Sequence, residues 1–400
     1  MSSSTSLENV LILQGGGSLG AFGCGVFKAL ANNNVKLDII AGTSIGGVNA
    51  AIVAGSKDDK YPEKVLEQFW LELAEGSKAL DNFSTYSPSF IQWLATADKF
   101  TSFASQHNSI VQPDKKLKIK SILSAYGSAV YGNDKFFKPR WKPEYVLADP
   151  EYSIPAEWTY LYDHSPLVKT LEKYIDYTKL KPTGGPSNTR LIMTAVNVLT
   201  AQPLTFDSYK QQITPKHILA TCGYPLYAFP WIEVESGVYA WDGGLLSNTP
   251  LREVIDASPV KDKQVFLVEN YPKNIVKLPK NLPEVYHRAR DIMFSDKTEF
   301  NITMSKVITM YLRYIDEMYQ VIEEFVDMNK ADKKRIEEIR LKYKKYKKER
   351  GAEIKKIWHI TRDEPFPFIY ENADFSLDAI KSSIVDGELK TNQILEKQSG

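Results

Sequence analysis

The chain has 400 residues, of which 43% are hydrophobic and 25% charged, so it can bury a sizeable core and is not a disordered polymer. Its 50 basic and 49 acidic residues give a net charge of +1, which excludes a global field that attracts nucleic acid or anionic lipid. Two cysteines exclude a disulfide framework and a cysteine-rich metal site. The sequence shows neither a basic leader nor about 18 consecutive apolar residues, so we expect a cytoplasmic protein.

A strand, a glycine-rich turn and a helix follow one another twice in the first 55 residues. Val10–Leu13 predicts a strand, GGGSLG at residues 15–20 predicts a tight turn, and apolar residues at helical spacing follow. Leu37–Ala41 predicts a second strand, which leads through GTSIGG at residues 42–47 into a helix at Val48–Val53. This order is typical of a parallel α/β sheet with right-handed crossovers.

The stretch 61–155 is rich in aromatic residues, with several prolines near its end. Two interpretations stay open: an insertion that covers an apolar site as a lid, or an ordinary helical subdomain with an aromatic core. Regular α/β patterning then resumes, and we expect helices at Pro166–Tyr174 and Pro215–Ala220 and strands at Arg190–Val198, Trp231–Val234, Val238–Trp241 and Gln264–Glu269.

The pattern becomes helical after Pro283. The expected elements are helices at Glu284–Phe294 and Glu299–Met328, a basic stretch at Lys330–Lys356, a strand at Ile357–Thr361 and a short helix at Asp374–Asp386. We therefore expect an α/β domain over residues 8–272, including the insertion, and a mostly helical extension over residues 275–400.

The pentapeptide GTSIG at residues 42–46 matches G-x-S-x-G, the pattern of a nucleophile elbow. In such a turn the serine stands between a strand and a helix, and Gly42 and Gly46 leave room where the backbone folds too tightly for Cβ atoms. Ser44 is therefore a candidate nucleophile.

The run GGGSLG also matches G-x-G-x-x-G, the dinucleotide-binding pattern, with Asp38 in the role of the ribose-binding acid. Asp38 opens the second strand, whereas a ribose ligand closes it, which disfavours this interpretation. Backbone N–H groups of a glycine-rich turn before a helix can instead hold an oxyanion. Because adjacent parallel strands end at one edge of a sheet, this turn and the Ser44 turn should lie together.

A serine nucleophile needs a base. The histidines lie in no recognisable catalytic motif, and we predict structural roles for His107, His164, His217, His287 and His359. A Ser–His–Asp arrangement with His287 or His359 stays open as a variant. DGG at residues 242–244 offers a carboxylate at a strand end, followed by glycines that allow close backbone approach, so Asp242 can accept the serine proton directly.

In this order, GGGSLG, GTSIG and DGG resemble the patatin-like phospholipase family. The resemblance extends through much of the first 270 residues, including FFKPRW at 136–141 and YAWDGGLLSNTPL at 239–251, and is similar to a bacterial subgroup with a C-terminal extension. It implies a three-layer α/β/α fold with a central, mostly parallel sheet plus a largely helical C-terminal extension. It also implies hydrolysis of a phospholipid or another acyl-ester lipid through an acyl-enzyme, without metal or cofactor.

By motif, the resemblance makes Ser44 the nucleophile and Asp242 the proton acceptor, and it makes the backbone N–H groups of Gly16, Gly17 and Ser18 the oxyanion hole. The remaining motif glycines are Gly15, Gly20, Gly42, Gly46, Gly243 and Gly244. Two alternatives share the fold: a catalytically weak lipid-binding scaffold, and an acyltransferase that uses the same dyad.

The sequence departs from the family at four positions. Gln14 replaces the usual Asp before the oxyanion loop, and Leu19 replaces a frequent Arg or Lys. Tyr224 and Tyr227 are bulky where relatives carry small residues, so we expect a reshaped acyl pocket.

A basic cluster lies within one predicted helix near the C-terminus. Its members are Lys342, Lys344, Lys345, Lys347, Lys348 and Arg350. One interpretation is a peripheral contact with anionic membrane; the one we favour is a solvated helix face balanced by nearby glutamates. Nucleic-acid binding is not expected, because no accompanying fold motif occurs.

Overall fold

The computed structural model describes residues 7–77, 113–141, 158–182, 189–325, 332–350, 352–364 and 370–397. Most of the predicted insertion, at 78–112 and 142–155, lies outside the described residues, and His107 with it. The side chains of Lys347, Lys348 and Arg350 are likewise not among those described.

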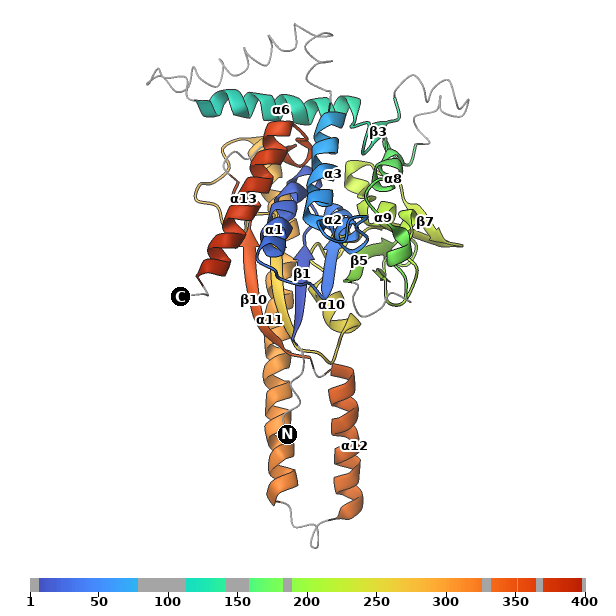
Figure 1. The fold of residues 1–400 in the computed structure, drawn as a ribbon, viewed down its shortest axis with the longest axis vertical. Helices are drawn as coiled ribbons and strands as arrows, with labels where there is room; N and C mark the ends of the chain where they lie inside the picture. Colours follow the sequence, from blue (N-terminus) through green and yellow to red (C-terminus); the bar gives the residue numbers. More distant parts are fainter. Residues whose placement is uncertain are drawn as a thin grey trace.

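Helices and strands alternate through most of the chain (Figure 1). The strands are β1 (Glu8–Leu13), β2 (Ile39–Thr43), β3 (Lys138–Pro139), β4 (Tyr162–Asp163), β5 (Arg190–Asn197), β6 (Pro203–Asp207), β7 (Ile232–Glu235), β8 (Val238–Asp242), β9 (Lys263–Glu269) and β10 (Ile354–Thr361). The α-helices are α1 (Ala21–Asn32), α2 (Ile45–Ala54), α3 (Pro62–Gly76), α6 (Pro113–Tyr131), α8 (Pro166–Leu171), α9 (Pro215–Cys222), α10 (Leu251–Ala257), α11 (Leu282–Phe325), α12 (Lys333–Arg350) and α13 (Leu377–Glu396).

The main sheet has eight strands in the order β10-β9-β1-β2-β5-β8-β7, with β6 paired to β5. The five strands from β10 to β5 run parallel, whereas β6, β7 and β8 pair in antiparallel fashion. The predicted mostly parallel sheet is thus confirmed. Strand β6, which begins at Pro203, was not predicted.

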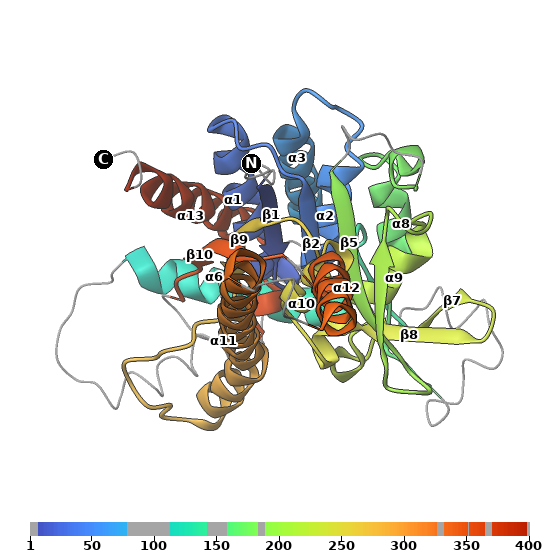
Figure 2. The same ribbon diagram turned by 90° about the horizontal axis from the view of Figure 1, so that it is seen from below.

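Helices cover both faces of the sheet, which makes the three layers (Figure 2). Side chains alternate along a strand, so Leu11 and Leu13 of β1 pack into the core with α1, α2, α3 and α13. Val10 and Ile12 point to the other face, where α10 and Ile302 of α11 cover them. Near-continuous apolar runs such as this one are typical of parallel strands buried on both faces.

The C-terminal part of the chain contributes to the same layers. Strand β10 extends the sheet beyond β9, and α13 packs on α1 through the buried Ile380 and Ile384. The predicted boundary near residue 275, between an α/β domain and a mostly helical extension, remains a prediction. The short helix predicted at Asp374–Asp386 is wrong in its bounds, because α13 starts at Leu377 and continues to Glu396.

The two helices predicted between Glu284 and Met328 are one continuous helix, α11. The residues between the two predicted helices, 295–298, are polar. The backbone stays helical there because Phe294 and Ile302, on either side of the run, are both buried against the body of the protein. No helix in the described ranges is sufficiently long and apolar to span a bilayer.

Candidate active site

Ser44 stands between β2 and α2 with a backbone conformation that nonglycine residues rarely adopt, φ 56° and ψ −131°. Its N–H donates to Oγ1 of Thr221 at 3.0 Å, and its carbonyl accepts from the N–H of Gly47 at 2.8 Å. The flanking glycines are required: a Cβ on Gly42 would lie 2.2 Å from the backbone of Gly46. Strain held by surrounding contacts is a mark of a functional turn.

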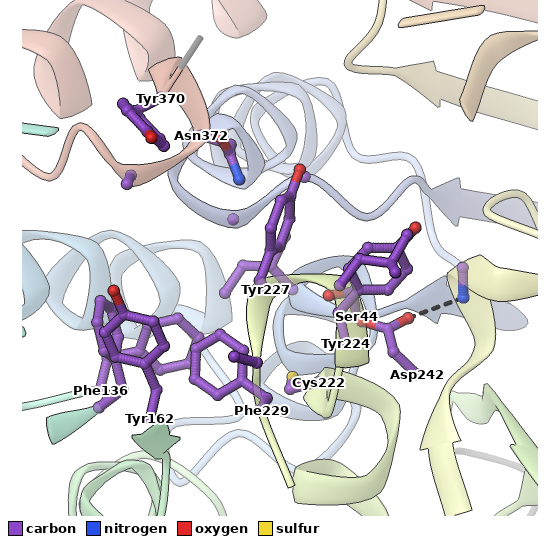
Figure 3. Close-up of a pocket in the computed structure, with 18 of the residues that line it drawn as sticks. Ser44, Phe136, Tyr162, Cys222, Tyr224, Tyr227, Phe229, Asp242, Tyr370 and Asn372 are labelled. Carbon is purple, nitrogen blue, oxygen red and sulfur yellow. Dashed lines mark hydrogen bonds between the residues drawn. The ribbon is translucent and has the colours of Figure 1, made fainter. Parts of the chain in front are cut away.

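The pairing of strands brings Asp242 to the same level of the sheet as Ser44. Thr43, directly before the serine, pairs with Thr194 of β5, and Ala195 of that strand pairs with Asp242 at the end of β8. Asp242 is 1% exposed, and one carboxylate oxygen accepts from the N–H of Gly244 at 2.8 Å. The Ser44 side chain lies beside the same carboxylate (Figure 3) and lowers its pKa.

Burial is the main influence on the Asp242 carboxyl and raises its pKa. The hydrogen bond from Gly244 and the nearby Ser44 hydroxyl lower the pKa and offset part of this effect, which leaves it at about 7, against 3.8 for an ordinary aspartate. A carboxylate with such a pKa is a much better proton acceptor near neutral pH than a solvated one.

The predicted oxyanion loop lies beside Ser44, because Leu13 at the end of β1 pairs with Gly42. Gly15 contacts the serine closely, and its N–H donates to Oδ1 of Asn248 at 3.1 Å. Among the hydrogen bonds between described residues, none takes the backbone N–H of Gly16 or Gly17. Both residues line the same cavity as Ser44, so these donors can serve a bound group.

The two loop departures from the family fit their surroundings. Oε1 of Gln14 accepts from the N–H of Asn270 at 2.8 Å, and Nε2 donates to Oγ1 of Thr249 at 3.1 Å. Leu19 is 4% exposed in an aromatic cluster with Tyr224, Tyr271 and Phe294. The amide therefore fixes the start of the loop, while the apolar side chain at position 19 is buried against aromatic rings.

A segment more than 350 residues downstream covers the loop. The 3₁₀ turn η7 (Glu371–Ala373) lies over it: the Glu371 carbonyl accepts from Oγ of Ser18 at 3.0 Å, and the Asn372 carbonyl abuts Gly17. Arg362 holds this turn through a bond to the Glu371 carboxylate at 2.6 Å. Burial tends to raise the pKa of that carboxyl, but the charges of Arg362 and Arg290 hold it below its ordinary value.

A cavity of about 340 Å³ opens at Ser44 and Asp242 (Figure 3). Its wall is predominantly aromatic and aliphatic, and the figure shows Phe136, Tyr162, Tyr224, Tyr227 and Phe229 arranged along it. Phe136 and Phe137 come from the described part of the 61–155 insertion, and Tyr370 and Phe375 come from the C-terminal segment. That the insertion covers this cavity as a lid stays a prediction, as does the alternative of an ordinary helical subdomain.

The other nucleophile and base candidates lie elsewhere or are inactivated. Of the four described histidines, none lines this cavity: His164 bonds to the Leu219 carbonyl, His217 caps α9, and His287 and His359 pair with carboxylates. Cys222 does line it, but burial, and then the charge of Asp242, raise the pKa of its thiol well above the ordinary value. Such a cysteine stays protonated.

Sequence reasoning did not assign Asn248, Thr221 or Asn372 to the site. Asn248 sits in the polar run after DGG, and this position was a usable signal for a residue that holds the loop. Thr221 and Asn372 carry no such signal, because only the fold brings α9 to the elbow and η7 to the oxyanion loop.

We expect Gly17→Ala to lower both stability and turnover, because Gly17 has φ 58° and an added Cβ would lie 2.2 Å from the Asn372 carbonyl oxygen. Gly237→Ala is the matched control: Gly237 has φ 75° but open space around it. The control should lose only the cost of the left-handed conformation, about 1 kcal/mol, and keep full activity. Gly17→Ala should lose more, together with about 10²-fold in kcat, as measured by denaturant unfolding and ester hydrolysis. Equal effects of the two changes would mean that η7 does not press on the loop.

Comparison with known proteins identifies the family. Residues 11–255 match the model of a family described as patatin-like phospholipase. A patatin-like phospholipase domain-containing protein of Coccidioides immitis (strain RS) is 40% identical over 81 residues, which cover 20% of this chain and 10% of that protein. The match therefore spans about a tenth of the length of this relative.

Two solved structures are similar along nearly the whole chain. VipD from Legionella pneumophila is 14% identical, with a TM-score of 0.38 and coverage of 99% of this chain and 67% of that one. The type III effector ExoU, a protein of Pseudomonas aeruginosa, is 11% identical, with a TM-score of 0.34 and coverage of 98% and 53%. Scores this low carry no functional argument. The family model, however, covers more than half of the chain, and on that finding this chain belongs to the patatin-like phospholipase family.

Proposed function

We propose that this protein is a lipid acyl hydrolase, of phospholipase A or lysophospholipase type, that uses Ser44 and Asp242 as a catalytic dyad. The observation that carries the proposal is the placement, in one cavity, of an elbow serine beside a buried aspartate whose pKa is raised to about 7. Membership in the patatin-like phospholipase family supports a lipid substrate, and the apolar wall of the cavity suits an acyl chain.

The first half-reaction forms an acyl-enzyme. Oγ of Ser44 attacks the ester carbonyl carbon while its proton passes to the Asp242 carboxylate. The negative charge that develops on the carbonyl oxygen is stabilised by the N–H groups of Gly16, Gly17 and Ser18. The intermediate then collapses: the ester C–O bond breaks, and the proton on Asp242 moves to the departing alcohol oxygen.

The second half-reaction releases the fatty acid. Water attacks the acyl carbon of the ester on Ser44, and Asp242 takes a proton from that water. The same N–H groups hold the second oxyanion. Collapse breaks the bond between the acyl carbon and the serine oxygen, returns the proton to Ser44, and leaves the fatty acid free.

Lipid hydrolysis with product analysis tests the proposal. The full chain is incubated with phosphatidylcholine vesicles and, separately, lysophosphatidylcholine micelles, and fatty acid and lysolipid are measured by mass spectrometry. Free fatty acid is the expected product. A fatty ester formed with added glycerol, in place of free acid, would favour the acyltransferase. A folded protein that turns over neither lipid nor a p-nitrophenyl acyl ester would favour the lipid-binding scaffold.

A further inference from the structure

The distal part of α11 and the whole of α12 form a two-helix arm that extends away from the sheet (Figure 1). We use "arm" for residues 304–325 together with Lys333–Arg350. Two polar interactions and one ring pair join its helices: Arg340 pairs with Glu323 at 2.7 Å, the Tyr343 hydroxyl donates to Asp316 at 2.8 Å, and Tyr343 stacks on Tyr319. The interior of the arm therefore combines polar pairs and a ring stack with the buried apolar side chains of Leu312 and Ile336.

The outside of the arm carries an apolar stripe. Its members recur on α11 at alternating spacings of four and three residues, and they are Met304, Ile308, Tyr311, Ile315, Met318, Ile322 and Phe325. Six of them are more than a third exposed, from 36% at Ile315 to 72% at Phe325. A solvated helix pair keeps its apolar residues on the face that the two helices share, so a second, exposed apolar row indicates a surface that is covered.

The spacing specifies what covers it. Alternation of four and three over three heptads is the a/d pattern of a coiled coil, with Ile308, Ile315 and Ile322 at a positions. A flat bilayer surface has no need of a 3.5-residue repeat, whereas a partner helix does. The next positions outward, Val307, Tyr314 and Val321, are also uncharged, so two identical stripes meet without like-charge repulsion.

The geometry of the arm suits a bundle of two arms. At 3.6 residues per turn, the apolar stripe lies about 100° around α11 from the residues that face α12. In a four-helix bundle each helix has two neighbours separated by about this angle. The arm supplies one of these neighbours, α12, and leaves the other place open.

Charge favours a second copy over a membrane. The last ten residues of α11 contain four acidic and no basic side chains, among them the exposed Glu317 and Glu324, which gives this end of the helix an acidic edge. This edge repels anionic lipid. Lys342, Lys344 and Lys345 are exposed on α12, so the basic helix of one arm complements the acidic edge of another. We propose that two copies of this chain associate through their arms as a four-helix bundle.

Sedimentation of the full chain between 1 and 100 µM tests the proposal. We expect the mass of a dimer for the wild type. Ile315→Glu with Met318→Glu places charges on the stripe and should weaken association by about 100-fold or more, because carboxylates are buried in an apolar seam. The matched control, Thr303→Glu with Gln320→Glu, adds the same charge at exposed positions off the stripe and should leave the dimer intact. Circular dichroism checks that both variants fold.

Cross-linking gives a second readout that does not depend on a disruptive change. Cys24 and Cys222 are buried, so an added exposed cysteine is the reactive thiol in the described part of the chain. Ile315→Cys should form covalent dimers with a short bismaleimide, and Gln320→Cys should not. A wild type that stays monomeric at 100 µM, or a dimer that survives the stripe substitutions, would overturn the proposal. A monomer that floats with phosphatidylcholine–phosphatidylserine vesicles, and loses this with the stripe substitutions, would assign the stripe to lipid instead.

Discussion

Replacing Ser44 by alanine should abolish ester hydrolysis, with a loss of at least about 10⁴-fold in kcat, because no other described group lining the cavity can take over as nucleophile. A fluorophosphonate probe should label the wild type on Ser44 alone, as read by mass mapping. Labelling should disappear in Ser44→Ala, while the fold and the cavity remain.

Ser236→Ala is the matched control, since Ser236 is an exposed serine in the turn between β7 and β8. It should keep wild-type labelling and turnover. Residual hydrolysis by Ser44→Ala above about 1% of the wild-type rate, or a probe adduct on another residue, would contradict the assignment of the nucleophile. A folded wild type that the probe does not label would instead favour the noncatalytic lipid binder.

The elements nearest the site were the most predictable from the sequence. GTSIG and GGGSLG each combine a strand, a tight turn and a helix within a few residues, so their local geometry follows from the absence of Cβ atoms. The edge at which they meet follows from parallel pairing, and β1 does lie beside β2. Asp242 was predictable only in combination with these two motifs, because DG alone is only a turn signal.

The C-terminal contributions to the site were not predictable, because they depend on tertiary packing. No local pattern indicates that β10 joins the sheet at β9 or that η7 reaches the oxyanion loop. Those positions are fixed by buried ion pairs such as that between Arg362 and Glu371, whose members are nine residues apart in the sequence. The single helix α11 was missed for a related reason: burial of its neighbours outweighs the weak helix propensity of the polar run at 295–298.

The described lysines of the basic cluster, Lys342, Lys344 and Lys345, are exposed, and Lys345 lies 3.9 Å from Glu349. This pairing agrees with the solvated, charge-balanced face that the sequence favoured, and contact with a membrane stays a prediction. Both interpretations considered α12 alone. The apolar stripe on α11 is hard to predict from the sequence, because the residues of α11 that face α12 recur at the same heptad spacing.

Replacing Asp242 by asparagine should separate catalysis from stability, because the same burial that makes this carboxylate a good base also makes its charge costly. We expect a loss of about 10³-fold or more in kcat/KM, since the amide cannot accept the Ser44 proton. In the wild type, kcat/KM should fall about tenfold per pH unit below pH 7, where Asp242 becomes protonated in the fold. In the asparagine variant, the residual kcat/KM should no longer fall as the pH drops below 7.

The Asp242→Asn variant should be more stable than the wild type, although it is less active. The pKa is about 7 in the fold and 3.8 for an ordinary aspartate, so the ionised group destabilises the fold increasingly as the pH rises from 3.8 to 7. Removing the charge should therefore stabilise the protein by up to about 4 kcal/mol at pH 8, by about 1.5 kcal/mol at pH 5, and not at all below pH 4. Guanidinium unfolding at these pH values, with Asp256→Asn as an exposed control, measures the difference. A variant that gains nothing at pH 8 would show that Asp242 is an ordinary, low-pKa carboxylate and that another group accepts the proton of Ser44.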